Sequence, residues 1–105
     1  MKPNMNAMKQ IQKAQAQMAR AQEELANEHV EASVGGGAVK VTMSGDLKVT
    51  SVAIDPRAVD PDDVAMLEDM VAAATNEALR QAQDLANNKM SAAMGGLGLP
   101  GGFGF

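Results

Sequence analysis

The fold is decided by three neighbouring segments: Val39-Lys-Val-Thr-Met-Ser-Gly45, Val52-Ala-Ile-Asp-Pro56 and Met66-Leu-Glu-Asp-Met-Val-Ala-Ala-Ala-Thr-Asn-Glu-Ala-Leu-Arg80. In the first segment apolar and polar residues alternate, which is typical of a strand with one buried face. The second segment ends in Asp-Pro, and proline stops a strand because it has no N–H for the sheet ladder. In the third, apolar residues recur every three or four positions, as on one face of a helix. Together they predict a hairpin followed by a long helix.

The residues on either side extend the hairpin to three strands. Residues 29–34 alternate in the same way, and a third run extends from Leu47 to Ile54. Gly35-Gly-Gly37 separates the first two runs, and Gly45-Asp46 separates the last two. The triple glycine resembles a phosphate-binding loop, but no Lys-Ser/Thr follows it and it leads into a strand rather than a helix. A hairpin turn is the better interpretation, and the three runs predict an antiparallel meander with one buried face.

A first long helix is predicted for residues 4–27, which contain no glycine or proline and are rich in strong helix formers. Ile11, Met18 and Leu25 recur every seven residues, and Gln15 and Gln22 lie between them. This is the spacing of a coiled-coil seam, weakened by its polar positions. We therefore expect the three apolar residues to pack partly on their own domain and partly on a partner subunit. The alternative is an amphipathic helix that only covers the sheet.

The second long helix is expected to open at Asp60-Pro61-Asp62-Asp63, with a capping acid and proline at the first helical position. It should continue to about residue 93. Leu67, Val71 and Ala74 mark its apolar face, which further apolar residues widen. A face this wide suggests contacts on two sides, with the sheet and with a second subunit. The aspartates are spaced somewhat like metal ligands, but they lack the glycine and the later glutamate of a calcium loop.

A chain of 105 residues is long enough for one domain only. We assign residues 1–94 to a single α+β domain of order α-β-β-β-α, a three-stranded antiparallel meander flanked by two long helices, and residues 95–105 to a flexible glycine-rich tail. Both aromatic residues lie in that tail, so the core must be aliphatic, and such a small core favours oligomerisation. The absence of cysteine excludes disulfides, and no stretch is apolar and long enough to span a membrane.

The net charge of −4 conceals an asymmetric distribution. Residues 1–20 hold four cations and no acid, whereas residues 21–31 hold four glutamates and no cation. The second predicted helix is also mainly acidic. A polyanion would therefore be attracted to the start of the chain and repelled by the second helix.

The joint order and spacing of these elements resemble the YbaB/EbfC family of bacterial nucleoid-associated proteins. The most specific matches are Val39 to Thr42, Ile54-Asp-Pro56 and Met66 to Leu79, and the ending Pro100-Gly-Gly-Phe103 is similar to the family's tail. The resemblance covers nearly the whole chain from Met8 onward. It implies an intertwined homodimer, built around the strands and the second helix, whose protruding helices hold duplex DNA. It also implies localisation in the cytoplasm and nucleoid, and an effect on gene expression.

DNA binding requires cations that replace the counterions on phosphates. Lys9 and Lys13 are four residues apart and share a helix face, and Arg20 lies near them. Lys2 precedes the helix, and Lys89 lies near the end of the second helix, which the resemblance places in the DNA-holding region. We predict DNA contacts for all five; the alternative is that they are ordinary solvated charges. Without stacking aromatics or a recognised reading motif, binding through the DNA backbone and shape is expected.

An enzyme is not expected. The single histidine, His29, lies on the polar side of a predicted strand, with no nucleophile arranged around it. We expect no cofactor, no metal, no small-molecule substrate and no membrane partner. Two hypotheses remain. One is a dimeric nucleoid-associated protein that binds double-stranded DNA; the other is a helical scaffold or protein-interaction dimer in which DNA binding is incidental.

Overall fold

The computed structural model describes residues 5–95. Its elements are helix α1 (Met5–Asn27), strands β1 (His29–Val34), β2 (Val39–Ser44) and β3 (Val49–Ile54), the short 3-10 helix η1 (Pro56–Ala58) and helix α2 (Val64–Gly95). The predicted α+β class and α-β-β-β-α order are confirmed. The segment predicted to be a flexible tail lies outside the described residues beyond Gly95. None of the helices in the described range is long and apolar enough to cross a membrane.

The three strands form one antiparallel sheet in the order β1-β2-β3. Val34 pairs with Val39 across the first hairpin, and Val39 pairs with Ile54 on its other side. All three glycines of the β1–β2 turn have positive φ angles, of 64°, 67° and 97°. Glycine adopts this conformation without strain because it has no Cβ. The interpretation of Gly35-Gly-Gly37 as a hairpin turn is therefore confirmed.

The second hairpin turn is longer than expected. Leu47 was expected to start the third strand, but it lies in the turn with a φ of 68°, and β3 begins at Val49. The N–H of Leu47 donates to the carbonyl of Ser44 at 3.0 Å, and the N–H of Ser44 donates to the carbonyl of Lys48 at 2.8 Å. These bonds close the turn around Leu47 and keep it out of the sheet ladder.

The start of α2 also differs from the expectation. The helix begins at Val64, because Asp60 closes a separate turn in which its carboxylate accepts from the N–H of Asp62 at 2.9 Å. The helix is capped instead by Asp63, whose carboxylate accepts from the N–H of Met66 at 3.2 Å. The predicted capping chemistry is present, but it acts three residues later.

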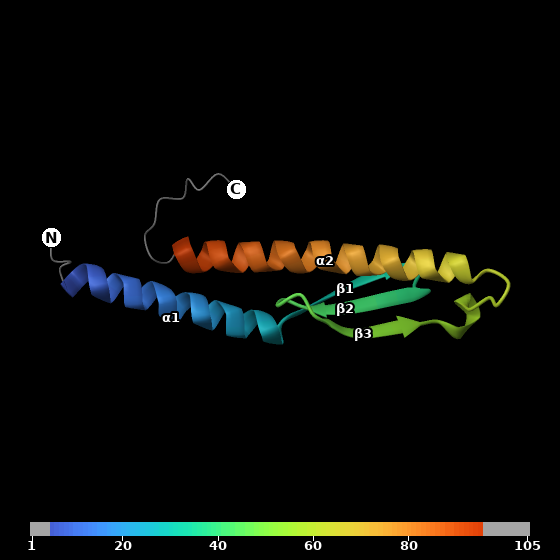
Figure 1. The fold of residues 1–105 in the computed structure, drawn as a ribbon, viewed down its shortest axis with the longest axis horizontal. Coiled ribbons are helices and arrows are strands. Elements are labelled where there is room, and N and C mark those ends of the chain that lie inside the picture. Colours follow the sequence, from blue (N-terminus) through green and yellow to red (C-terminus); the bar gives the residue numbers. More distant parts are fainter. Residues whose placement is uncertain (1–4, 96–105) are drawn as a thin grey trace.

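The core lies between one face of the sheet and α2, which crosses that face in Figure 1. Among the core side chains of residues 5–95, those with no exposed surface are Val39, Val41, Ala74, Ala78 and Ala82. The three alanines are four residues apart and line one stripe of α2, so their small side chains allow the helix to lie close to the strands. Leu67 and Val71 are half-buried and pack against the same cluster. Leu67, Val71 and Ala74 therefore serve the core of the single chain.

Helix α1 and the C-terminal half of α2 form a two-helix arm that extends beyond the sheet (Figure 1). The two helices run antiparallel. Leu25 is buried where the arm meets the sheet, and a Cβ added to Gly45 would lie only 2.6 Å from the Leu25 carbonyl oxygen. The N–H of Gly45 donates to the carbonyl of Glu28 at 2.9 Å. The resulting molecule is elongated, measuring 71 × 24 × 21 Å with a radius of gyration of 19.7 Å.

Strand β3 is the least covered part of the sheet. Val49, Val52 and Ile54 pair with core residues of β2, so their side chains point to the core face. They are nevertheless 48%, 47% and 38% exposed, because α2 packs mainly over β1 and β2. The core face of the sheet therefore extends beyond the helix that covers it.

Candidate nucleic-acid interface

Three of the five predicted DNA contacts lie together on α1. Lys9, Lys13 and Arg20 are exposed, and none of them makes an ion pair within residues 5–95. From the helical period they fall within a sector of about 40°. This face stays cationic because the helix has no acid before Glu23. Lys2, the fourth predicted contact, lies outside the described residues.

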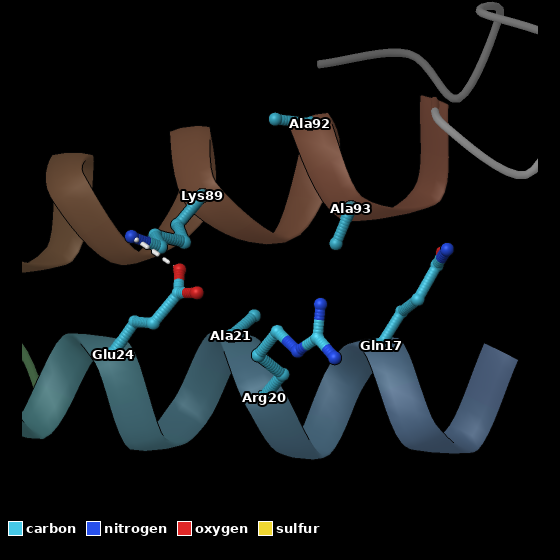
Figure 2. Close-up of a pocket in the computed structure, with 7 residues that line it drawn as sticks. All are labelled: Gln17, Arg20, Ala21, Glu24, Lys89, Ala92 and Ala93. Carbon is cyan, nitrogen blue, oxygen red and sulfur yellow. Dashed lines mark ion pairs between the residues drawn. The ribbon is translucent and has the colours of Figure 1, made fainter. Parts of the chain in front are cut away.

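Lys89, the fifth predicted contact, is held in ion pairs. Its ammonium nitrogen lies 2.8 Å from a carboxylate oxygen of Glu24 and 2.8 Å from one of Glu28, and Figure 2 shows it reaching from α2 to Glu24 on α1. The hydrogen bond with Glu24, followed by that with Glu28, raises the pKa of Lys89. The same bond lowers the pKa of Glu24. Lys89 therefore joins the two helices of the arm.

A cleft opens between α1 and α2 beside this ion pair (Figure 2). Its lining residues are Gln17, Arg20, Ala21, Glu24, Lys89, Ala92 and Ala93. Arg20 therefore belongs to the α1 cationic face and also lines this cleft with Lys89, so four of the predicted cations belong to one arm. The Oε1 atom of Gln17 is buried without a hydrogen-bond partner. Sequence reasoning missed Gln17; its only signal was its position four residues before Ala21, on the side of α1 that faces α2.

Replacing Lys89 with methionine is expected to lower the melting temperature at neutral pH, because Glu24 and Glu28 would then face each other without a cation. Lys89 lowers the pKa of Glu24 from its ordinary value of 4.5. The carboxylate of Glu24 therefore binds a proton more readily in the unfolded chain than in the folded one, and its ion pair with Lys89 stabilises the fold above pH 4.5. This stabilisation is lost as the pH falls through the lowered pKa of Glu24 in the folded protein. Thermal unfolding followed by circular dichroism should therefore show that the difference in melting temperature between the variant and the unmodified protein becomes smaller from pH 7 down to pH 3. A constant difference across this range would contradict the ion-pair explanation.

The apolar seam of α1 is buried at one end only. Leu25 is 5% exposed, whereas Met18 is 37% and Ile11 is 58% exposed. The contact with α2 comes from a neighbouring row of small residues, with Ala21 buried between the helices. Within the single chain this seam packs on its own domain at Leu25 and leaves Met18 and Ile11 exposed, because the sheet does not extend beneath them. Their packing on a partner remains a prediction.

The surface of α2 opposite the core is unfavourable for DNA. Arg80 is neutralised by Glu77 at 2.6 Å and by Asp84 at 3.1 Å, and hydrogen bonds from Arg80 and then Gln81 lower the pKa of Glu77 to about 2. Glu68 and Asp69 are exposed about three turns earlier in the same helix. In the part of the chain that the structure describes, no group of three or more His, Cys, Asp or Glu residues is placed to hold a metal ion. A polyanion would therefore be directed from α2 towards the start of α1.

Comparison with known proteins shows the family and the fold of the chain. Residues 1–97 match the model of the YbaB/EbfC DNA-binding family. A nucleoid-associated protein of Ruminiclostridium cellulolyticum is 52% identical over 99 residues, which cover 93% of this chain and 86% of that protein. One of Moorella thermoacetica is 54% identical over 99 residues, covering 93% and 95%. The fold is similar to that of an uncharacterized protein from Helicobacter pylori, with a TM-score of 0.73, 15% identity and coverage of 91% and 99%.

Proposed function

The chain belongs to the YbaB/EbfC DNA-binding family, and we propose that it binds duplex DNA mainly through phosphate contacts from the cationic face of α1. The observation that supports this proposal is that Lys9, Lys13 and Arg20 are exposed on one side of the helix and form no ion pair with any residue in the described range 5–95. From Lys9 to Arg20 the helix rises about 16 Å, roughly half of the 34 Å helical repeat of DNA. A single α1 can therefore follow the phosphates along one groove edge.

The two remaining predicted cations have different parts in this proposal. Lys2 extends the basic segment of the sequence towards the N-terminus, and we propose it as a further phosphate contact. Lys89 already pairs with Glu24 and Glu28. We therefore propose that its main role is to hold the arm together, while its charge adds to the positive potential beside Arg20.

We also propose that the protein acts as a homodimer. The support is the uncovered core face of β3, where Val49, Val52 and Ile54 are exposed at an edge strand of the sheet. A small aliphatic domain with an apolar sheet face open to water is stabilised when a second subunit covers that face. Dimerisation would present the cationic face of α1 twice, so that two helices could contact one duplex.

Relatives at about half identity are named nucleoid-associated proteins, and we propose that this chain also resides in the nucleoid, within the bacterial cytoplasm. Contacts with phosphates carry no direct sequence information. Binding spread along the chromosome would therefore affect gene expression through DNA shape and occupancy rather than by reading one operator.

Fluorescence anisotropy with a labelled duplex of about 30 base pairs, roughly three helical turns, tests DNA binding across a salt series. The logarithm of the affinity should fall linearly with the logarithm of salt concentration, with a slope of about −0.9 for each phosphate contact. Native mass spectrometry of the same sample should give twice the mass of the chain. Failure of a folded dimer to bind at low salt would overturn the proposal for the isolated protein.

A second function is favoured by one observation, the exposed apolar side chains of Met8, Ile11 and Met18 on α1. In this alternative the protein is a scaffold, and the apolar stripe formed by Met8, Ile11 and Met18 binds another protein. Changing Ile11 and Met18 to glutamine should then abolish partner capture. Under the DNA-binding proposal the same change should leave the anisotropy titration unaltered, because Lys13 lies about 160° around the helix from Ile11.

A further inference from the structure

The apolar stripe of α1 ends in the core at one end and in solvent at the other. Leu25 is buried against Gly45, directly after the end of the central strand β2. Along the same line of the helix, Met18, Ile11 and Met8 are 37%, 58% and 50% exposed. Residues 5–95 therefore cover this part of the stripe only in part. An apolar face of this length on a small protein normally has an occupant.

The sequence outside the described residues supplies a suitable occupant. Residues 96–105 contain no charged side chain, and they include both aromatic residues of the chain. Their large apolar residues are Leu97, Leu99, Phe103 and Phe105. This segment can therefore lie on an apolar surface without removing a charged side chain from water, and its burial would contribute the aromatic surface that the core lacks.

The end of α2 brings this segment to the stripe. Lys89 lies opposite Glu24 and Glu28, and further along α2, Ala92 and Ala93 line a cleft with Gln17. Because the helices are antiparallel, α2 ends beside the middle of α1 (Figure 1). Ten extended residues reach at most about 33 Å, while Met8 and Met18 are separated by about 15 Å along the helix. The segment is long enough to cover the stripe of its own chain.

We propose that residues 96–105 bind in cis to the Met8–Ile11–Met18 stripe, with Leu97, Leu99 and Phe103 as the apolar contacts. The segment then completes the covering of α1 where the sheet ends. The cationic face of α1 points the other way and stays open. This inference stands on the stripe and on the reach of the chain, and it does not depend on whether the protein binds DNA.

Paramagnetic relaxation measurements on the full chain test the proposal. The chain has no cysteine, so Gly104→Cys gives a single site for a nitroxide label. In protein with ¹³C-labelled methionine methyl groups, the signals of Met8 and Met18 should lose most of their intensity. The Met66 signal should not, because it lies in the first turn of α2 at the far end of the molecule.

Two comparisons make the result decisive. Leu97→Ser with Phe103→Ser in the labelled chain should restore the Met8 and Met18 signals, whereas the matched pair Gly98→Ser and Gly102→Ser should not. Mixing spin-labelled chains without ¹³C with unlabelled ¹³C chains should leave the signals unchanged. The proposal is overturned if Met8 and Met18 are affected no more than Met66, or if they lose as much intensity in the mixture as in the uniformly labelled sample, which would assign the stripe to the segment of another copy.

Discussion

Replacing Lys9, Lys13 and Arg20 together with glutamine is expected to weaken binding to duplex DNA by roughly a hundredfold. Removing each cation from its phosphate should cost about 1 kcal/mol, and about 3 kcal/mol corresponds to that change in Kd. The salt slope should also fall in magnitude by about 0.9 for each phosphate that is no longer neutralised. Glutamine keeps the helix propensity high, and all three side chains are exposed, so the fold should be retained. Anisotropy titration at several salt concentrations measures both quantities.

The matched control removes three cations from other parts of the chain. Lys40, Lys48 and Arg57 are exposed on or near the sheet, and changing them to glutamine alters the net charge by the same amount. This control should retain most of the affinity, because it leaves the α1 face intact. Equal losses of affinity in the two triple variants would mean that overall charge, and not this face of α1, determines binding.

The largest loss of stability is expected from Ala78→Leu, at about 3 kcal/mol, the upper part of the range for overfilling a packed core. Ala78 has no exposed surface and lies in the middle of the alanine stripe that packs on the sheet. A leucine there must push α2 away from Val39 and Val41, which are also fully buried. Urea unfolding followed by circular dichroism measures the change in the free energy of unfolding.

Ala72→Leu provides the control, because Ala72 is on the exposed side of the same helix. Alanine and leucine have similar helix propensities, so this variant should unfold within about 0.5 kcal/mol of the unmodified protein. If both variants were equally stable, the close approach of α2 to the sheet would not depend on the alanine stripe.

Much of the fold could be predicted because local patterns agree with the tertiary arrangement. The alternation of Val39, Val41 and Met43 indicated which side of β2 is buried, and all three are in the core. The glycines of the first turn likewise indicated the hairpin. The start of α2 was predicted wrongly because several neighbouring residues can act as the helix cap. The segment from Asp60 to Asp63 contains three aspartates, and Asp63 caps the helix because Asp60 is used to close the preceding turn.

The candidate site was harder to predict because it depends on contacts between distant parts of the chain. The positions of Lys9, Lys13 and Arg20 on one helix face follow from their spacing alone. The pairing of Lys89 with Glu28 joins residues 61 positions apart, so no local pattern reveals it. The exposure of Ile11 and Met18 depends on how far the sheet extends along α1. Periodicity identifies an apolar stripe, but it does not specify how much of that stripe meets another element.

The elongated arm has a consequence for hydrodynamic behaviour. A compact domain of about this length has a radius of gyration of about 13 Å, whereas this chain has 19.7 Å. A rod-like particle experiences more friction and diffuses more slowly than a sphere of equal mass. On a gel-filtration column calibrated with globular standards, one chain will therefore elute as if it were considerably heavier than 10.9 kDa. Elution volume alone will overstate the number of subunits, so stoichiometry has to be taken from methods that weigh the particle independently of its shape.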